Sequence, residues 1–207
     1  MELQYFGANC LRLTSKNVAI VVDDNLQKLG LKTITKPEDI SLRTSADMPI
    51  HDSRFVADMP GEYEISGVAI HGLAARSHMD EEGKTSAVIY TVEADEVKVL
   101  ILGHVFPKLS EEQVEQIGLI DIAVVPVGGN GYTLDGVGAL GILKNIEPKV
   151  VIPVHYADKA IKYEVPQASL EEALKGLGME PTETVAKYKF KAAEASDVTR
   201  LIVLERQ

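Results

Sequence analysis

Short runs in which apolar and polar residues alternate dominate the first half of the chain, as far as residue 102. Such alternation is typical of strands that have one buried and one exposed face. Turn-forming residues, among them Gly7-Ala8-Asn9 and Ser66-Gly67, separate the runs. The pattern predicts a series of hairpins with strands at 3–6, 10–14, 18–22, 39–44, 53–56, 61–65, 68–74, 86–92 and 97–102.

The second half changes to helices that alternate with fully apolar strands. Ser110 and Gln113 have the spacing of a capping box, so a helix is expected from there to about Gly118. The order of the elements predicts an α/β (α+β) fold of two sheets with helices outside them, rather than one doubly wound parallel sheet. The remaining elements are helices at 133–146 and 169–177, strands at 121–127 and 150–154 that are apolar enough to be buried on both faces, and final strands at 184–190 and 201–204.

Composition narrows the class of protein. With 207 residues, 45% of them hydrophobic, the chain is long enough to form a core, and we expect a single domain over 1–207. The net charge of −10 and the lack of a Lys/Arg block argue against a nucleic-acid surface. Cys10 is the only cysteine, which excludes an internal disulfide and fits a reducing compartment. Since the N-terminus is not signal-like and no apolar run is long enough to span a membrane, a cytoplasmic protein is expected.

Histidines supply the first candidates for chemistry. His78, His104 and His155 each follow the end of a predicted strand. Because strand ends converge at the rim of a sheet, these side chains can meet over one pocket. Imidazole is a common zinc ligand, and three histidines with a water form a known catalytic arrangement. The alternative, which spacing alone favours, is a set of separate surface or capping histidines.

Other polar residues near strand ends leave both a chemical and a structural interpretation open. Asp23 can orient a ligand histidine or can simply end a strand in a turn. Asp80 lies two residues from His78 but also begins a charge run of the kind that is usually solvated. The stretch Gly128-Gly129-Asn130-Gly131 can bind an anion through its backbone, although a tight strand-to-helix turn is favoured because the P-loop lysine is missing. Cys10, on an early strand, is expected to be a buried structural thiol.

Several blocks of the sequence, in this order, resemble one known family nearly from end to end. The chain is similar to the metallo-β-lactamase fold, in its small branch of zinc-dependent hydrolases related to the L-ascorbate-6-phosphate lactonase group. The resemblance implies a four-layer αββα sandwich with a metal site at one rim of the sheets. The blocks that carry it are YFGANC at 5–10, PGEYE at 60–64, DIAVVPVGG at 121–129, YTLD at 132–135 and IPVHY at 152–156.

The metal-binding motifs of that family are only partly present. The family's HxHxDH motif is expected after the strand at 40–44, where this chain reads TSADMPIHD and leaves Asp47 and His51 as isolated candidates. The bridging aspartate of the family falls on His104, and an early histidine falls on Ala8. The residues that do match are Asp23, His78 and His155.

These departures make a standard two-zinc site improbable and leave three hypotheses. The first is a non-catalytic or altered descendant with a degraded binuclear site, whose rim pocket binds an unidentified small molecule or serves assembly. The second is a mononuclear hydrolase of small phosphoesters or lactones that holds one Zn or Mn ion on His78, His104 and His155. In that case Asp23 supports the ligands and Asp47 or Asp80 acts as the base. The third, least favoured, is an acidic homo-oligomeric interaction module.

Overall fold

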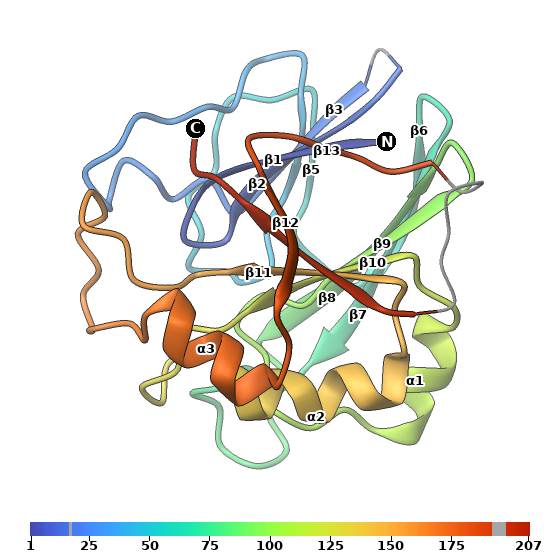
Figure 1. Ribbon diagram of the computed structural model, residues 1–207. Coiled ribbons are helices and arrows are strands. Elements are labelled where there is room, and N and C mark those ends of the chain that lie inside the picture. Colours follow the sequence, from blue (N-terminus) through green and yellow to red (C-terminus); the bar gives the residue numbers. More distant parts are fainter. Residues whose placement is uncertain (17, 192–197) are drawn as a thin grey trace.

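Two mixed β-sheets face each other in the part of the chain that the structure describes, residues 1–16, 18–191 and 198–207 of a computed structural model (Figure 1). The first sheet has, from edge to edge, the strands β13 (Tyr188–Lys189), β1 (Glu2–Gly7), β2 (Cys10–Ser15), β3 (Val18–Val22), β4 (Ile40–Leu42) and β5 (Phe55–Ala57). The second sheet has the strands β12 (Pro181–Val185), β14 (Arg200–Leu204), β11 (Val150–Val154), β10 (Ile122–Pro126), β9 (Val97–Ile101), β8 (Ala87–Ala94), β7 (Val68–Ala75) and β6 (Gly61–Ile65).

Helices cover the outer face of the second sheet. They are α1 (Glu111–Ile117), α2 (Gly136–Ile146) and α3 (Leu170–Leu177), which lie together at the bottom of Figure 1. Their apolar faces pack on residues of β8 to β11, such as Ile89, Val125 and Val151, while a separate apolar core fills the space between the two sheets. Burying apolar surface on both sides explains why β10 and β11 have no exposed residue.

Irregular chain covers the outer face of the first sheet. Leu26, Leu31 and Ile34 pack there on Cys10 and Val21. The side chain of Asp24 fixes this segment by accepting hydrogen bonds from the backbone and hydroxyl groups of residues 33–35. The expected sandwich of two sheets with helices is therefore confirmed. Its fourth layer, over the first sheet, is formed largely by this segment.

Most elements lie where the sequence pattern predicts them, and capping explains their ends. Ser110 and Ser169 each form a complete capping box, with Gln113 and Glu172 respectively. The helix predicted at 133–146 begins later than expected, because the side chain of Asp135 accepts a hydrogen bond from the backbone of Gly138 and caps α2 there.

The prediction of one strand at 184–190 is wrong, because the structure divides this segment into two strands that belong to different sheets. β12 pairs with β14 in the second sheet, whereas β13 pairs with β1 in the first. Tyr188 and Phe190 turn into the core between the sheets, and their rings lie 6.5 Å apart. The apolar pattern continues across the division, so alternation alone cannot reveal the change of partner.

No helix among the described residues has both the length and the apolar character that a membrane span requires.

Close backbone contact between α2 and α3 gives a stability prediction. A Cβ atom on Gly136 would lie 2.3 Å from the carbonyl oxygen of Ala173 and 2.9 Å from Cα of Gly176, so the two helices would have to separate. We expect Gly136→Ala to lower the free energy of unfolding by about 1–3 kcal/mol, measured by urea denaturation.

Gly141→Ala, in the same helix, is the matched control. A Cβ there meets nothing within 4 Å, so improved helix propensity should raise the stability by up to about 1 kcal/mol. Equal free energies of unfolding for the two variants would show that the close contact between α2 and α3 does not contribute to the stability of the fold.

Candidate functional site

Strands of both sheets end at a common rim, where the backbone repeatedly adopts left-handed conformations. The residues with positive φ include Ala8 (48°) after β1, Asp23 (44°) after β3, Gly103 (61°) after β9 and His155 (59°) after β11. The backbone N–H of His155 donates a hydrogen bond to the carbonyl of Ala8, at 2.9 Å, and so joins the two sheets. Uncommon conformations of non-glycine residues cost about 1 kcal/mol or more each, and they concentrate at functional sites.

Two of the histidines meet at this rim. Nε2 of His104 lies 3.2 Å from Nε2 of His155, and the rings are nearly perpendicular. Nδ1 of His104 lies 3.1 Å from Nδ2 of Asn9, and Nδ1 of His155 lies 3.1 Å from Oε1 of Gln167. The side chains thus form a chain of hydrogen bonds from the loop after β1 to the segment before α3, which we call the histidine chain.

The hydrogen-bonding partners determine the protons on both rings. The Asn9 amide donates to Nδ1 of His104, so the proton of that ring is on Nε2 and is donated to Nε2 of His155. His155 then carries its own proton on Nδ1 and donates it to Gln167, whose amide nitrogen in turn donates to the carbonyl of Val165. An extra proton on either ring would place two hydrogen-bond donors against each other. The histidine chain therefore requires both imidazoles to be neutral.

The surroundings of the rings favour the same neutral state. Burial lowers the pKa of His104 to about 3, helped by the neighbouring His155 and His78. Burial likewise lowers the pKa of His155 to about 4, although the hydrogen bond to Gln167 opposes the shift. Both side chains are therefore uncharged hydrogen-bonding groups at neutral pH.

Glycines and tyrosines close the space around the histidine chain. A Cβ on Gly128 would lie 1.9 Å from Oε1 of Gln167 and 2.2 Å from the carbonyl oxygen of His155, so a side chain there would displace the chain. This close packing supports the interpretation of residues 128–131 as a tight turn. Tyr132 lies edge-on to His104 at 5.4 Å, and the Tyr163 ring lies 5.1 Å from His155.

Asp23 is buried beside the chain and is held by Thr44. Its two carboxylate oxygens accept hydrogen bonds from the backbone N–H of Thr44, at 2.8 Å, and from the Thr44 hydroxyl, at 2.6 Å. Burial raises the pKa of Asp23 to about 6, despite these hydrogen bonds and the nearby charge of Arg43. Thr44 can approach because residue 103 is glycine: a Cβ there would lie 2.4 Å from the Thr44 hydroxyl.

His78 lies beside the pair but is not joined to it by its side chain. Its backbone N–H donates to the carbonyl of His104, at 2.8 Å, and its ring lies 6.2 Å from that of Phe106. Nδ1 of His78 is buried without a hydrogen-bond partner in the described part of the chain. The structure therefore brings two of the predicted ligands together and places the third next to them.

The remaining candidates, Asp80, Asp47 and His51, have structural partners or lie on the surface. Asp80 accepts hydrogen bonds from Ser77 and Ser86. Partial burial raises its pKa, but these bonds outweigh that effect and leave the pKa below the usual range. Asp47 is exposed, and Nε2 of His51 is 2.6 Å from the backbone carbonyl oxygen of Asp24. Within the described residues, no three His, Cys, Asp or Glu side chains are grouped so as to hold a metal ion.

Comparison with known proteins identifies the family to which the chain belongs. Residues 2–155, most of the chain, match the family model described as a beta-lactamase superfamily domain. The chain belongs to the metallo-β-lactamase superfamily. A candidate Zn-dependent hydrolase of this superfamily from Thermotoga maritima is 26% identical with a TM-score of 0.78, and the match covers 99% of this chain and 98% of that one.

Two further proteins are also similar to this chain, one over only part of its length and the other at lower sequence identity. A UPF0173 metal-dependent hydrolase from Enterococcus faecalis is 28% identical over 123 residues, which are 59% of this chain and 49% of the relative. The chain thus matches about half the length of that curated relative. The metallo hydrolase Igni18 from Ignicoccus hospitalis shares the fold, with a TM-score of 0.63 and 20% identity over 92% of this chain and 99% of that one.

The sequence did not reveal the polar partners of the histidines and of Asp23 at this rim. Asn9 and Gln167 orient the two histidines, and Thr44 holds Asp23. Asn9 lies in a segment that the sequence suggests only as a turn, and Gln167 lies outside every predicted element. Signals were nevertheless present, because Asn9 belongs to the YFGANC block and Gln167 is two residues before the capping serine of α3.

The lowered pKa values of His104 and His155 and the raised pKa of Asp23 predict how the stability of the protein depends on pH. Between about pH 4 and 6, unfolding lets both histidines take up a proton, whereas Asp23 releases one, so about one proton is bound in total. These groups should therefore make the free energy of unfolding fall by about 1.4 kcal/mol for each pH unit as the pH decreases. Urea denaturation between pH 4.5 and 6 measures the slope.

Asp23→Asn tests this account, because it removes the group that releases a proton on unfolding while the two histidines take protons up. The net uptake becomes about two protons, and the slope should roughly double to about 2.7 kcal/mol per pH unit. Asp121→Asn, which removes a carboxylate far from the rim, is the comparison and should not steepen it. An unchanged slope in Asp23→Asn would contradict the assigned ionisation states.

Proposed function

We propose that this chain is a metallo-β-lactamase-fold, hydrolase-like protein that does not carry out two-metal hydrolysis. The observation that carries the proposal is the histidine chain, in which His104 and His155 bond to each other and to Asn9 and Gln167. Their ring nitrogens are thereby used in protein contacts. In this account, the histidine chain holds the rim loops together.

The supply of ligands argues against a binuclear centre. Two ions that share an activated water need several protein ligands each, commonly His and Asp or Glu. At this rim Asp23 is bonded to Thr44, and Asp80 fixes its own loop. The side chain of His51 is bonded to the backbone of Asp24. The residues present therefore do not fit a two-metal site.

A single ion is the alternative, and one distance favours it. Two imidazole nitrogens bound to one tetrahedral zinc are separated by about 3.3 Å, given Zn–N bonds of about 2.0–2.1 Å. The Nε2–Nε2 distance of 3.2 Å is close to this value. His78 has a buried nitrogen without a partner, and two relatives are described as metal-dependent hydrolases. The alternative is a mononuclear hydrolase of small phosphoesters or lactones.

Metal content per chain separates the two accounts. The protein is purified without chelator, dialysed against excess zinc or manganese, passed through a desalting column and analysed for metal by elemental analysis. We expect only traces of either metal, and no hydrolysis of p-nitrophenyl phosphate or of a simple lactone above the rate of buffer, because the nitrogens of both histidines already have partners.

Variants identify the residues responsible if metal is found. About one equivalent that is retained in His71→Ala, a histidine on β7, but lost in both His104→Ala and His155→Ala would overturn the proposal in favour of the mononuclear hydrolase. Metal that persists in all three variants would lie elsewhere on the protein and would leave the account of the rim intact. Circular dichroism of each variant checks that its fold is retained.

A further inference from the structure

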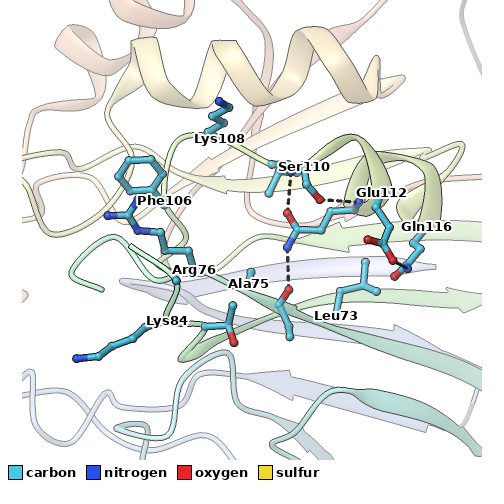
Figure 2. Close-up of a pocket in the computed structure, with 14 residues that line it drawn as sticks. Leu73, Ala75, Arg76, Lys84, Phe106, Lys108, Ser110, Glu112 and Gln116 are labelled. Atoms are coloured by element: carbon cyan, nitrogen blue, oxygen red, sulfur yellow. Dashed lines mark hydrogen bonds between the residues drawn. The ribbon is translucent and has the colours of Figure 1, made fainter. Parts of the chain in front are cut away.

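A separate pocket of about 560 Å³ lies between the end of β7, the loop at 83–85 and the start of α1. Figure 2 shows the side chains that line it. Its volume is in the range of pockets that bind small molecules. It does not include His104, His155 or the other members of the histidine chain. The Phe106 ring forms part of its wall, and the ring of His78 lies 6.2 Å from that ring.

Backbone hydrogen bonds and a ring stack fix Arg76 in this wall. The backbone carbonyl of Arg76 accepts a hydrogen bond from the N–H of Phe106, at 2.9 Å, and the guanidinium carbon lies 3.9 Å from the centre of the Phe106 ring. Nε and Nη2 donate to the carbonyl of Asp80. Among the described residues Arg76 has no carboxylate partner, so its Nη1 group remains available to an anion.

The cations of the lining do not converge on one point. In Figure 2, Arg76 and Lys84 lie on one side and Glu112 and Gln116 on the other, while Lys108 lies above, and the ends of the two lysines point away from each other. Lys84 pairs with Glu81 at 3.1 Å, but both groups are largely exposed, and such pairs contribute little. Glu112 is hydrogen-bonded to Gln116, at 3.2 Å. Asp80, Glu81 and Glu82 lie in the same loop as Lys84, so Arg76, rather than the lysines, is the group placed to bind an anion.

Apolar and rigid groups form the middle of the pocket. Leu73 and Ala75 of β7 lie on its floor together with Leu109. Gln113 closes one side, since its Nε2 donates to the carbonyl of Ala74 at 2.7 Å and its Oε1 accepts from the N–H of Ser110 at 2.9 Å. The wall is therefore tied to the sheet before a ligand arrives, which lowers the entropic cost of binding.

We propose that this pocket binds a small organic anion, with its phosphate or carboxylate group at Arg76 and its apolar body on Leu73 and Ala75. The stack of Arg76 on Phe106 presents the guanidinium edge to the anion, and Lys84 and Lys108 add a weaker, longer-range attraction. The site is independent of the histidine chain, and no metal takes part in it.

Phenyl phosphate is a suitable probe, because it combines a dianion with a flat apolar body. Titrated into the ¹⁵N-labelled full chain, it should cause saturable shifts in the ¹H–¹⁵N NMR spectrum, with a Kd on the order of 1 mM for a ligand of this size. The shifted amides should be those of Arg76, Lys84, Phe106 and residues 108–113. Shifts that do not saturate, or that lie outside this region, would overturn the proposal.

Charge variants test the cations of the pocket. A Lys84→Gln/Lys108→Gln double variant changes only exposed side chains and should raise the Kd about threefold. Arg76→Gln should abolish saturable binding. Lys159→Gln, which removes an equally exposed charge outside the pocket, should leave the Kd unchanged. Saturable binding that survives Arg76→Gln would refute the proposed site, and one Kd shared by wild type, the double variant and Lys159→Gln would refute a contribution from the lysines.

Two further probes separate the parts of the ligand. Inorganic phosphate carries the charge alone and benzyl alcohol carries the apolar body alone, so each should bind at least tenfold more weakly than phenyl phosphate. Inorganic phosphate bound as tightly as phenyl phosphate would contradict the role of the apolar floor. Benzyl alcohol bound as tightly would contradict the role of Arg76 and the lysines.

Discussion

The hydrogen bond between His104 and His155 is the contact on which the arrangement of this rim depends. It connects two loops of the second sheet, and its neighbours Asn9 and Gln167 extend it to the first sheet and to the segment before α3. Each hydrogen bond of the chain needs a donor that faces an acceptor, so each ring must keep one proton and no charge. The glycine at 128 follows from the same constraint, since a side chain there would displace Gln167.

The fold was largely predictable from the sequence, because its elements are built from local signals. Alternation locates β1 to β3, and capping boxes at Ser110 and Ser169 locate two helices. The predictions fail where a long-range partner decides. One continuous apolar pattern at 184–190 serves two sheets, and the start of α2 depends on which polar residue reaches a free N–H.

The candidate site was predictable only in part, for the same reason. Strand ends indicated where His104 and His155 would meet, because the parallel strands β9, β10 and β11 share a direction. The ring orientations could not be predicted, since they depend on loop residues such as Asn9 and Gln167 that have no periodic pattern. The resemblance to the superfamily indicated the rim but not the protonation of the rings, which the hydrogen bonds determine.

A shared fold does not by itself preserve the chemistry of a site. A carboxylate has two oxygens and can bridge two ions, whereas a neutral imidazole offers one lone pair. With histidine at position 104, that single lone pair is on Nδ1 and accepts from Asn9, while Nε2 donates to His155. Under the proposed function, both nitrogens of His104 are therefore used in protein contacts, and this side chain cannot bridge two ions in the way that a carboxylate can.

The loop at 76–86 connects the rim with the pocket beside α1, and Asp80 is the residue that gives the loop its shape. Its carboxylate accepts hydrogen bonds from Ser77 and Ser86, and its carbonyl accepts two from Arg76. The same loop places the His78 backbone against His104. The sequence suggested either a catalytic base or a solvated charge for Asp80. The contacts instead support a structural role, in which one aspartate fixes the residues that face both the histidine chain and the pocket.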